Sequence, residues 1–171
     1  MEIIATERYT LYVTTIDHAG SAQRCVAERA AVASLMAAAL PGAVLRHDEH
    51  GAPFIVEGEG GGCVHISISH SRNYAVLAVS VCAMGVDVEE DGRRRQLERV
   101  SARFLRGDDY LNNGGFLAAW TAKEAVFKAA GIPTAVLSDI RLTHEGDASL
   151  DGRGFALFSH RLSDALITVA L

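Results

Sequence analysis

One strand constrains the possible folds of this chain more than any other feature. Residues 74–82, Tyr-Ala-Val-Leu-Ala-Val-Ser-Val-Cys, are nearly all apolar, which is typical of a strand covered on both faces. Residues 63–69, Cys-Val-His-Ile-Ser-Ile-Ser, alternate instead and place Val64, Ile66 and Ile68 on one face. The four residues between them, His-Ser-Arg-Asn, read as a tight turn. The sequence therefore predicts two consecutive strands, of which the second is buried on both sides.

The remaining patterns predict strands and helices before and after this pair. Before it come a strand at 8–16, a helix from Ser21 to about Leu40 that Pro41-Gly42 ends, and short strands at 43–47 and 53–56. After it come a strand at 85–90, helices near 96–105 and 115–130, and weak strands at 138–143, 154–158 and 164–170. We therefore predict an α+β fold in which a single domain, 1–171, has two halves of similar plan, about 1–83 and 84–171.

Composition and length disfavour several classes of protein. The three cysteines, Cys25, Cys63 and Cys82, are widely separated and form no CxxC pair, which favours a reducing compartment and hence the cytoplasm. The first ten residues lack the pattern of a signal peptide, and no apolar run approaches the roughly 20 residues that span a membrane. A net charge of −5 argues weakly against a nucleic-acid partner.

The charge is unevenly distributed along the chain. Six arginines fall within fourteen residues and are opposed there only by Glu98; they are Arg93, Arg94, Arg95, Arg99, Arg103 and Arg106. A local basic segment on an acidic protein suggests an acidic partner, although a solvated helix face is the alternative.

Two carboxylates share one face of the strand Gly85-Val86-Asp87-Val88-Glu89. Because side chains alternate along a strand, Asp87 and Glu89 point the same way. Like charges this close repel unless a cation or a proton lies between them, and Mg²⁺ prefers oxygen ligands. The pair is therefore either part of a magnesium site or an acidic strand edge that faces solvent.

The helix at 115–130 holds the only two lysines of the chain, Lys123 and Lys128. Glu124 and Lys128 share a face at a spacing of four residues, and Trp120 lies one turn before Glu124. Read alone, Glu124 and Lys128 form a surface salt bridge. Two ammonium groups around a carboxylate also suit a polyphosphate held by a metal ion.

Ser69-His70-Ser71 lies where an apolar strand ends. Hydroxyl groups and an imidazole at that position suit a phosphate contact or, equally, the capping of a turn.

Three motifs follow one another along the chain: Ser69-His70-Ser71, then Gly-Val-Asp-Val-Glu, then Trp-x-x-Lys-Glu-x-x-x-Lys. In this order they resemble the motifs of the 4′-phosphopantetheinyl transferase superfamily, of the type that activates surfactin synthetase. The preceding Gly51-Ala52-Pro53-Phe54 and the N-terminal helix fit the same layout. The resemblance implies two pseudo-symmetric α+β halves, each with a small, mostly antiparallel sheet packed on a helix. It also implies transfer of the phosphopantetheine arm of coenzyme A to a serine of an apo acyl or peptidyl carrier protein, with release of adenosine 3′,5′-bisphosphate.

The resemblance also implies roles for individual residues. Asp87, Glu89 and Glu124 would hold Mg²⁺, while Lys123 and Lys128 would contact phosphate oxygens. Ser69 and His70, and with them Arg24, would bind coenzyme A phosphates, in particular the 3′-phosphate. The serine proton would go to Glu124 or to a metal-bound water. Glu124 and Lys128 are thus the expected catalytic residues, and the Arg93–Arg106 segment is the expected docking region for the carrier protein.

The chain departs from the family pattern at some points. It is short, the stretch between Phe104 and Trp120 is compressed, and Ala52 replaces the basic residue of the family's turn, with His50 or Arg46 as substitutes. These departures bear on affinity and carrier preference. The alternatives that remain are a non-catalytic module that binds coenzyme A or a carrier protein, and another Mg²⁺-dependent enzyme acting on a nucleotide diphosphate. A monomer without nucleic-acid or membrane partners is expected.

Overall fold

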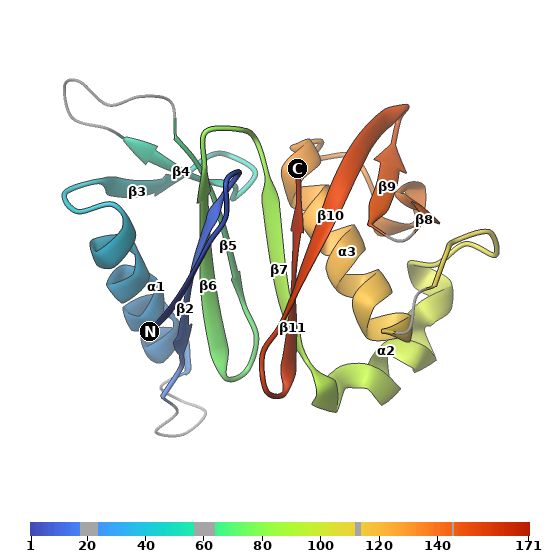
Figure 1. The fold of residues 1–171 in the computed structure, drawn as a ribbon, viewed down its shortest axis with the longest axis horizontal. Helices are drawn as coiled ribbons and strands as arrows, with labels where there is room; N and C mark the ends of the chain where they lie inside the picture. Colours follow the sequence, from blue (N-terminus) through green and yellow to red (C-terminus); the bar gives the residue numbers. More distant parts are fainter. Residues whose placement is uncertain (18–23, 57–63, 112–113, 145) are drawn as a thin grey trace. The chain divides into compact units, whose positions relative to one another are not determined.

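The computed structural model of the chain describes residues 1–17, 24–56, 64–111, 114–144 and 146–171 (Figure 1). Their contacts divide the chain into two compact units, Met1–Ala83 and Met84–Leu171. Each unit has an antiparallel sheet and one helix of 16 residues packed on it. The predicted α+β class with antiparallel sheets on helices is therefore confirmed.

The first unit has a sheet of four antiparallel strands in the order β1-β2-β6-β5. Its elements are β1 (Glu2–Ala5), β2 (Thr10–Thr15), α1 (Arg24–Ala39), β3 (Val44–His47), β4 (Pro53–Val56), β5 (His65–His70) and β6 (Tyr74–Ser80). The strands β3 and β4 form a separate hairpin. The predicted double coverage of β6 is confirmed, since Ala75, Val76, Leu77 and Ala78 are all 0% exposed.

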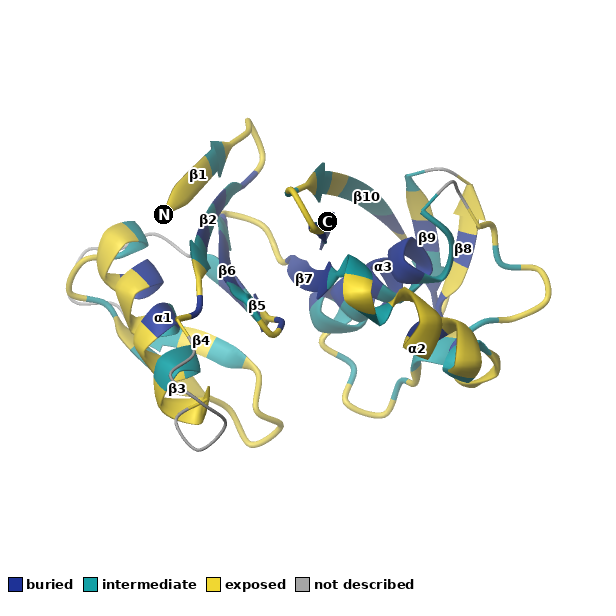
Figure 2. Cartoon of the chain, turned by 90° about the horizontal axis from the view of Figure 1, so that it is seen from below, coloured by how far each residue is buried: buried dark blue, intermediate teal, exposed yellow. Residues whose placement is uncertain are grey.

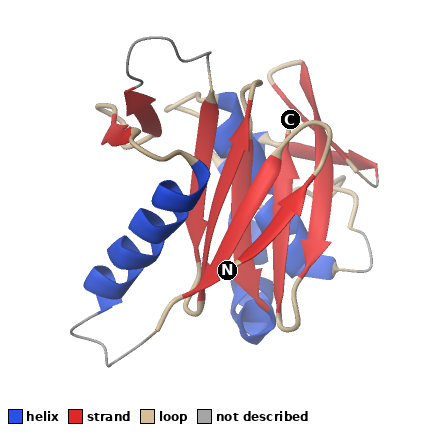
Figure 3. Ribbon diagram, turned by 60° about the vertical axis from the view of Figure 1, so that its left-hand side comes forward, coloured by secondary structure: helices blue, strands red, loops and turns tan. Residues whose placement is uncertain are grey.

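The helix α1 packs on β2 and β6 and runs along the sheet of its unit (Figure 3). Alanine, the strongest helix former, occupies seven of its sixteen positions. Its inner side meets the sheet through Ala31, Leu35 and Met36, and its other side is exposed (Figure 2). Ser21, where this helix was predicted to begin, lies outside the described residues, as does the glycine-rich stretch 57–62, whose composition favours a loop.

The second unit has a sheet of five antiparallel strands in the order β7-β11-β10-β9-β8. Its strands are β7 (Gly85–Glu90), β8 (Arg141–His144), β9 (Asp147–Leu150), β10 (Arg153–Arg161) and β11 (Ala165–Ala170). Its helices are α2 (Arg94–Val100), α3 (Gly115–Ala130) and the 3-10 turns η2 (Asp91–Arg93), η3 (Ser101–Arg103) and η4 (Leu137–Asp139). The helix α3 packs on β7 and β11 and buries nine of its sixteen residues, so it forms the centre of this unit.

Several boundaries differ from the predicted ones. The short helix begins two residues earlier than predicted and ends in a 3-10 turn, and the strand predicted at 138–143 begins at Arg141 after η4. The strands β1 and β9 were not predicted because they are short and their formation depends on pairing with β2 and β10. Among the described helices, none has the length and apolarity needed to cross a membrane.

Candidate functional site

Three carboxylates from two adjacent elements of the second unit lie close together. Asp87 and Glu89 lie on one face of β7 and are each 6% exposed, and Glu124 comes from α3, which packs on β7. Burial raises the pKa of Glu89 to about 7; Arg93 opposes this shift, and the charges of Asp87 and Glu124 add to it. Burial, followed by the charge of Asp87, also raises the pKa of Glu124. We call Asp87, Glu89 and Glu124 the carboxylate cluster.

Gly85 explains how the strand and the helix come close enough to form this cluster. A Cβ atom at position 85 would overlap the carbonyl oxygen of Ala125 and lie 2.5 Å from the amide nitrogen of Ala129. It would also lie 2.9 Å from the Cβ of Lys128. Only glycine therefore allows this contact, which places the glycine of the Gly-Val-Asp-Val-Glu motif in a structural role.

Two cations of the protein neutralise part of the cluster. Lys128 Nζ donates to Asp87 Oδ1 at 2.9 Å and to the carbonyl oxygen of Val86 at 2.9 Å. Arg93 Nη1 donates to Glu89 Oε1, and its guanidinium lies 6.0 Å from the ring centroid of Trp120. The ring of Trp120 is in turn packed edge-to-face against Phe104. The tryptophan of the Trp-x-x-Lys-Glu-x-x-x-Lys motif thus supports the arginine that binds Glu89 of the Gly-Val-Asp-Val-Glu motif.

The chemistry of these donors fits a hard divalent cation such as Mg²⁺. Glu89 Oε2 is buried and has no hydrogen-bond partner among the described residues, and the raised pKa values of Glu89 and Glu124 reflect the cost of burying negative charge there. The side chains are not arranged as a finished metal site, however. Within the described residues, no three histidine, cysteine or acidic side chains are placed to hold an ion. Two of the carboxylates form ion pairs within the protein instead, Asp87 with Lys128 and Glu89 with Arg93.

Lys123 does not point into the carboxylate cluster. It is fully buried, and its Nζ donates to Asp109 Oδ2 at 2.6 Å and to the carbonyl oxygen of Ile140 at 2.6 Å. Asp109 also accepts from the amides of Arg106 and Leu142. The structure thus corrects the expected phosphate contact, because this ammonium group is enclosed and bonded on a different side of α3.

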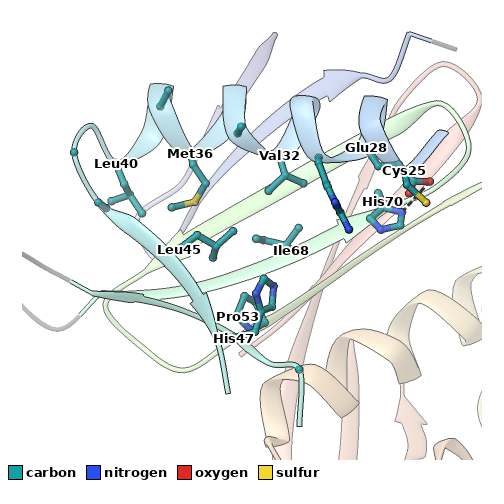
Figure 4. Close-up of a pocket in the computed structure, with 16 residues that line it drawn as sticks. Cys25, Glu28, Val32, Met36, Leu40, Leu45, His47, Pro53, Ile68 and His70 are labelled. Carbon is teal, nitrogen blue, oxygen red and sulfur yellow. Dashed lines mark ion pairs between the residues drawn. The ribbon is translucent and has the colours of Figure 1, made fainter. Parts of the chain in front are cut away.

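The first unit contains a groove of about 900 Å³ between α1, the β3–β4 hairpin and β5 (Figure 4). Its walls are mainly apolar side chains, among them Val32 and Met36 of α1, Leu40 directly after this helix, and Ile68 of β5. His70 lies at one end of the groove, next to Glu28 and Cys25. A long apolar groove with a few polar groups at one end is typical of a site for a small molecule or cofactor.

Of the two predicted phosphate ligands on β5, only His70 lines this groove. Side chains alternate along the strand, so Ser69 faces the side of β5 opposite to Ile68 and His70. Ser69 is 6% exposed and is not among the described residues that line the groove. The Ser-His pair of the motif therefore does not converge on this groove.

Arg24 meets the groove indirectly, through Glu28. Arg24 Nε donates to Glu28 Oε1 at 2.6 Å, and the same oxygen lies 3.8 Å from His70 Nδ1. Glu28 lines the groove, whereas Arg24 is not among the described residues that do. The sequence analysis did not single out Glu28, although its spacing of four residues from Arg24 on a helix predicts an ion pair between the two side chains.

The turn at Ala52 contributes backbone and apolar groups to the groove rather than a cation. Asp48 Oδ1 accepts from the amides of His50 and Ala52 and fixes this turn. Neither Arg46 nor His50, the expected substitutes, is among the described residues that line the groove. His47 lines it instead, a result that alternation along β3 explains, since Leu45 lines it as well.

The basic segment divides into two sets of three arginines. Arg93, Arg94 and Arg106 bond to other groups of the second unit, namely Glu89, Asp91 and the carbonyl oxygen of Ser138. Arg95, Arg99 and Arg103 are exposed and form no hydrogen bond or ion pair within the described ranges. They follow one another at intervals of four residues, so they line one side of α2 and η3.

Comparisons with known proteins point to one kind of enzyme. No protein-family model matches the chain. The chain is 28% identical over 98 residues to 4′-phosphopantetheinyl transferase gsp of Aneurinibacillus migulanus, covering 52% of this chain and 38% of that protein. It is 53% identical over 38 residues to holo-[acyl-carrier-protein] synthase of Geobacillus kaustophilus (strain HTA426), covering 22% of this chain and 30% of that protein. The matched stretches thus span less than half the length of either relative.

Proposed function

We propose that this chain, which belongs to the 4′-phosphopantetheinyl transferase superfamily, transfers the phosphopantetheine arm of coenzyme A to a serine of an apo carrier protein. The observation that carries the proposal is the carboxylate cluster, in which the buried Asp87 and Glu89 and the half-buried Glu124 lie next to Lys128. A buried cluster of carboxylates costs stability and is therefore a sign of function.

In this reaction the serine Oγ forms a bond to the phosphorus that carries the pantetheine arm. The bond from that phosphorus to the oxygen of the adenosine bisphosphate breaks, and the serine proton leaves. Positioning and neutralisation of charge supply most of the acceleration in phosphoryl transfer. Mg²⁺, held by Asp87, Glu89 and Glu124, would supply charge neutralisation on the pyrophosphate when bound.

The residues of the chain have separate tasks in this proposal. Lys128, whose side chain is 28% exposed, would donate from Nζ to a phosphate oxygen and offset the charge that develops on the leaving group. Glu124 would accept the serine proton, because burial and Asp87 raise its pKa and thereby make it a stronger base. Lys123 has no part in the reaction here.

The groove of the first unit would hold the adenosine end of coenzyme A. Its apolar walls suit the adenine ring and ribose, and His70 at its polar end would meet the 3′-phosphate, with Arg24 and Arg29 nearby on α1. The arginines Arg95, Arg99 and Arg103 would meet the acidic surface of the carrier protein, since they are exposed on one side of α2 and η3 and form no ion pair within the described ranges. Cys25 and Cys82 are free thiols, which fits the proposed cytoplasmic location.

The test is intact-protein mass spectrometry of an apo carrier protein incubated with this chain, coenzyme A and Mg²⁺, with and without EDTA. We expect the carrier protein to gain the mass of one phosphopantetheine arm, and EDTA to block the gain. Asp87→Asn and Glu124→Gln should abolish transfer while circular dichroism shows an intact fold. Arg95→Ala with Arg99→Ala should raise the KM for the carrier protein and leave the Kd for coenzyme A unchanged.

Failure of transfer to every carrier protein, with coenzyme A binding intact, would contradict the proposal. The chain would then be a non-catalytic module that binds coenzyme A. Release of adenosine bisphosphate without any carrier protein would instead indicate hydrolysis of the nucleotide.

A further inference from the structure

We propose that Glu28 determines how strongly the groove prefers a ligand with a 3′-phosphate. In the free protein its carboxylate binds Arg24 and lies beside His70, the two side chains that such a phosphate needs, so that only a ligand carrying the phosphate displaces it. This inference rests on the proposed binding of coenzyme A in the groove of the first unit.

The contacts of Glu28 place one carboxylate between the guanidinium of Arg24 and the imidazole of His70. Oε1 accepts from Arg24 Nε at 2.6 Å and lies 3.8 Å from His70 Nδ1. The side chain of Glu28 is 14% exposed, whereas those of Arg24 and His70 are 51% and 45% exposed. The anion is thus the enclosed partner, and the two side chains that reach it are accessible to a ligand.

The position of this carboxylate at the end of the groove makes it a competitor of the ligand. Glu28, Arg29 and His70 all line the groove, and Figure 4 shows Glu28 beside His70 at the end opposite to Leu40. A phosphate monoester carries up to two negative charges and three acceptor oxygens, so it is a better partner for a guanidinium and an imidazole N–H than one carboxylate. Because two anions repel at this distance, the phosphate and the Glu28 carboxylate do not share these cations.

This exchange means that Glu28 weakens the preference of the groove for the 3′-phosphate. A ligand without the 3′-phosphate leaves Glu28 bonded to Arg24 and gains no contact with Arg24. A ligand with the phosphate gains contacts with Arg24 and His70 but must displace the carboxylate. Glu28 therefore lowers the affinity for the phosphorylated ligand and leaves that for the dephosphorylated ligand nearly unchanged.

The experiment is isothermal titration calorimetry of the full chain with coenzyme A and with dephospho-coenzyme A, which lacks only the 3′-phosphate. Glu28→Gln keeps the size of the side chain and removes its charge. We expect this variant to bind coenzyme A about tenfold more tightly and dephospho-coenzyme A with less than about a twofold change. The matched control is Glu49→Gln, which removes the same charge from a side chain that is 86% exposed and outside the described lining of the groove.

Other outcomes would overturn the inference. Weaker binding of coenzyme A by Glu28→Gln would mean that Glu28 orients the cations for the ligand. Equal tightening of both ligands, or the same change in Glu49→Gln, would mean that only net charge matters. If the wild-type chain bound neither ligand, the proposed binding of coenzyme A would fail first, and this inference with it.

Discussion

Lys123 and Lys128 lie on the same helix, five residues apart, yet the structure uses them in opposite ways. The side chain of Lys123 is 0% exposed and its partner Asp109 is 1% exposed, while Lys128 is 28% exposed beside Asp87 at 8%. Asp109 also accepts two backbone amides and therefore connects α3 to the segment around Arg106 and to β8. Asp87 belongs to the carboxylate cluster.

The difference in burial between Lys123 and Lys128 separates a lysine that stabilises the fold from one that a substrate can reach. Burial lowers the pKa of Lys123, and the hydrogen bond that Lys123 donates to Asp109 opposes this shift, so the ion pair holds both charges inside the unit. A cation enclosed in this way stabilises the fold and is not accessible to a substrate. Lys128 remains partly accessible next to the carboxylates, which is what a phosphate contact requires.

The largest expected effect is on stability, from Lys123→Met. Removing one partner leaves Asp109 buried without its cation, which should lower the free energy of unfolding by about 3–5 kcal/mol. Urea denaturation followed by circular dichroism measures this change. A loss below about 1 kcal/mol would show that the two lysines do not differ in the way described.

The next effect is on catalysis, from Lys128→Met. We expect turnover to fall about 100-fold, equivalent to about 2.7 kcal/mol in the barrier, while the Kd for coenzyme A changes much less. Stability should change by no more than about 1 kcal/mol because the pair is partly exposed. The mass-spectrometric transfer assay measures the turnover rate. An unchanged rate would show that Lys128 only forms a structural salt bridge and does not contribute to catalysis.

The third effect is a dependence of stability on pH in the absence of metal. The pKa of Glu89 is about 7 in the folded protein and 4.5 in its ordinary state, so the folded protein binds more protons between these values. The free energy of unfolding should therefore fall as the pH rises from about 4.5 to about 7, with about 3 kcal/mol due to Glu89.

Glu89→Gln isolates this contribution from those of the other titrating groups. Its free energy of unfolding, measured in urea between pH 5 and pH 8 with EDTA, should vary less with pH than that of the wild type. Identical pH profiles for the two proteins would show that Glu89 is not protonated near neutral pH. Added Mg²⁺ should stabilise the wild type at pH 8 and stabilise the variant less.

Local patterns were sufficient for much of the fold. The apolar run at 74–82 predicted the buried strand β6, and the motif at 85–90 matched β7 to the residue. Short strands such as β9 were missed because their own residues carry little strand preference and pairing with β10 stabilises them. The carboxylates Asp87, Glu89 and Glu124 were proposed together from motif order, and the mutual effect on their pKa values depends on the packing of α3 on β7.

The sequence by itself determined which residue types this chain offers: three carboxylates, two lysines on one helix and a histidine at the end of a strand. Only the tertiary structure decided which of them meet. Lys123 donates hydrogen bonds to Asp109 and to the carbonyl oxygen of Ile140, and Lys128 donates to Asp87. Ser69 lies on the face of β5 opposite to His70. The physical reason is that spacing along a helix or strand sets the direction of a side chain. The burial and the partner that set its charge come from segments distant in the sequence.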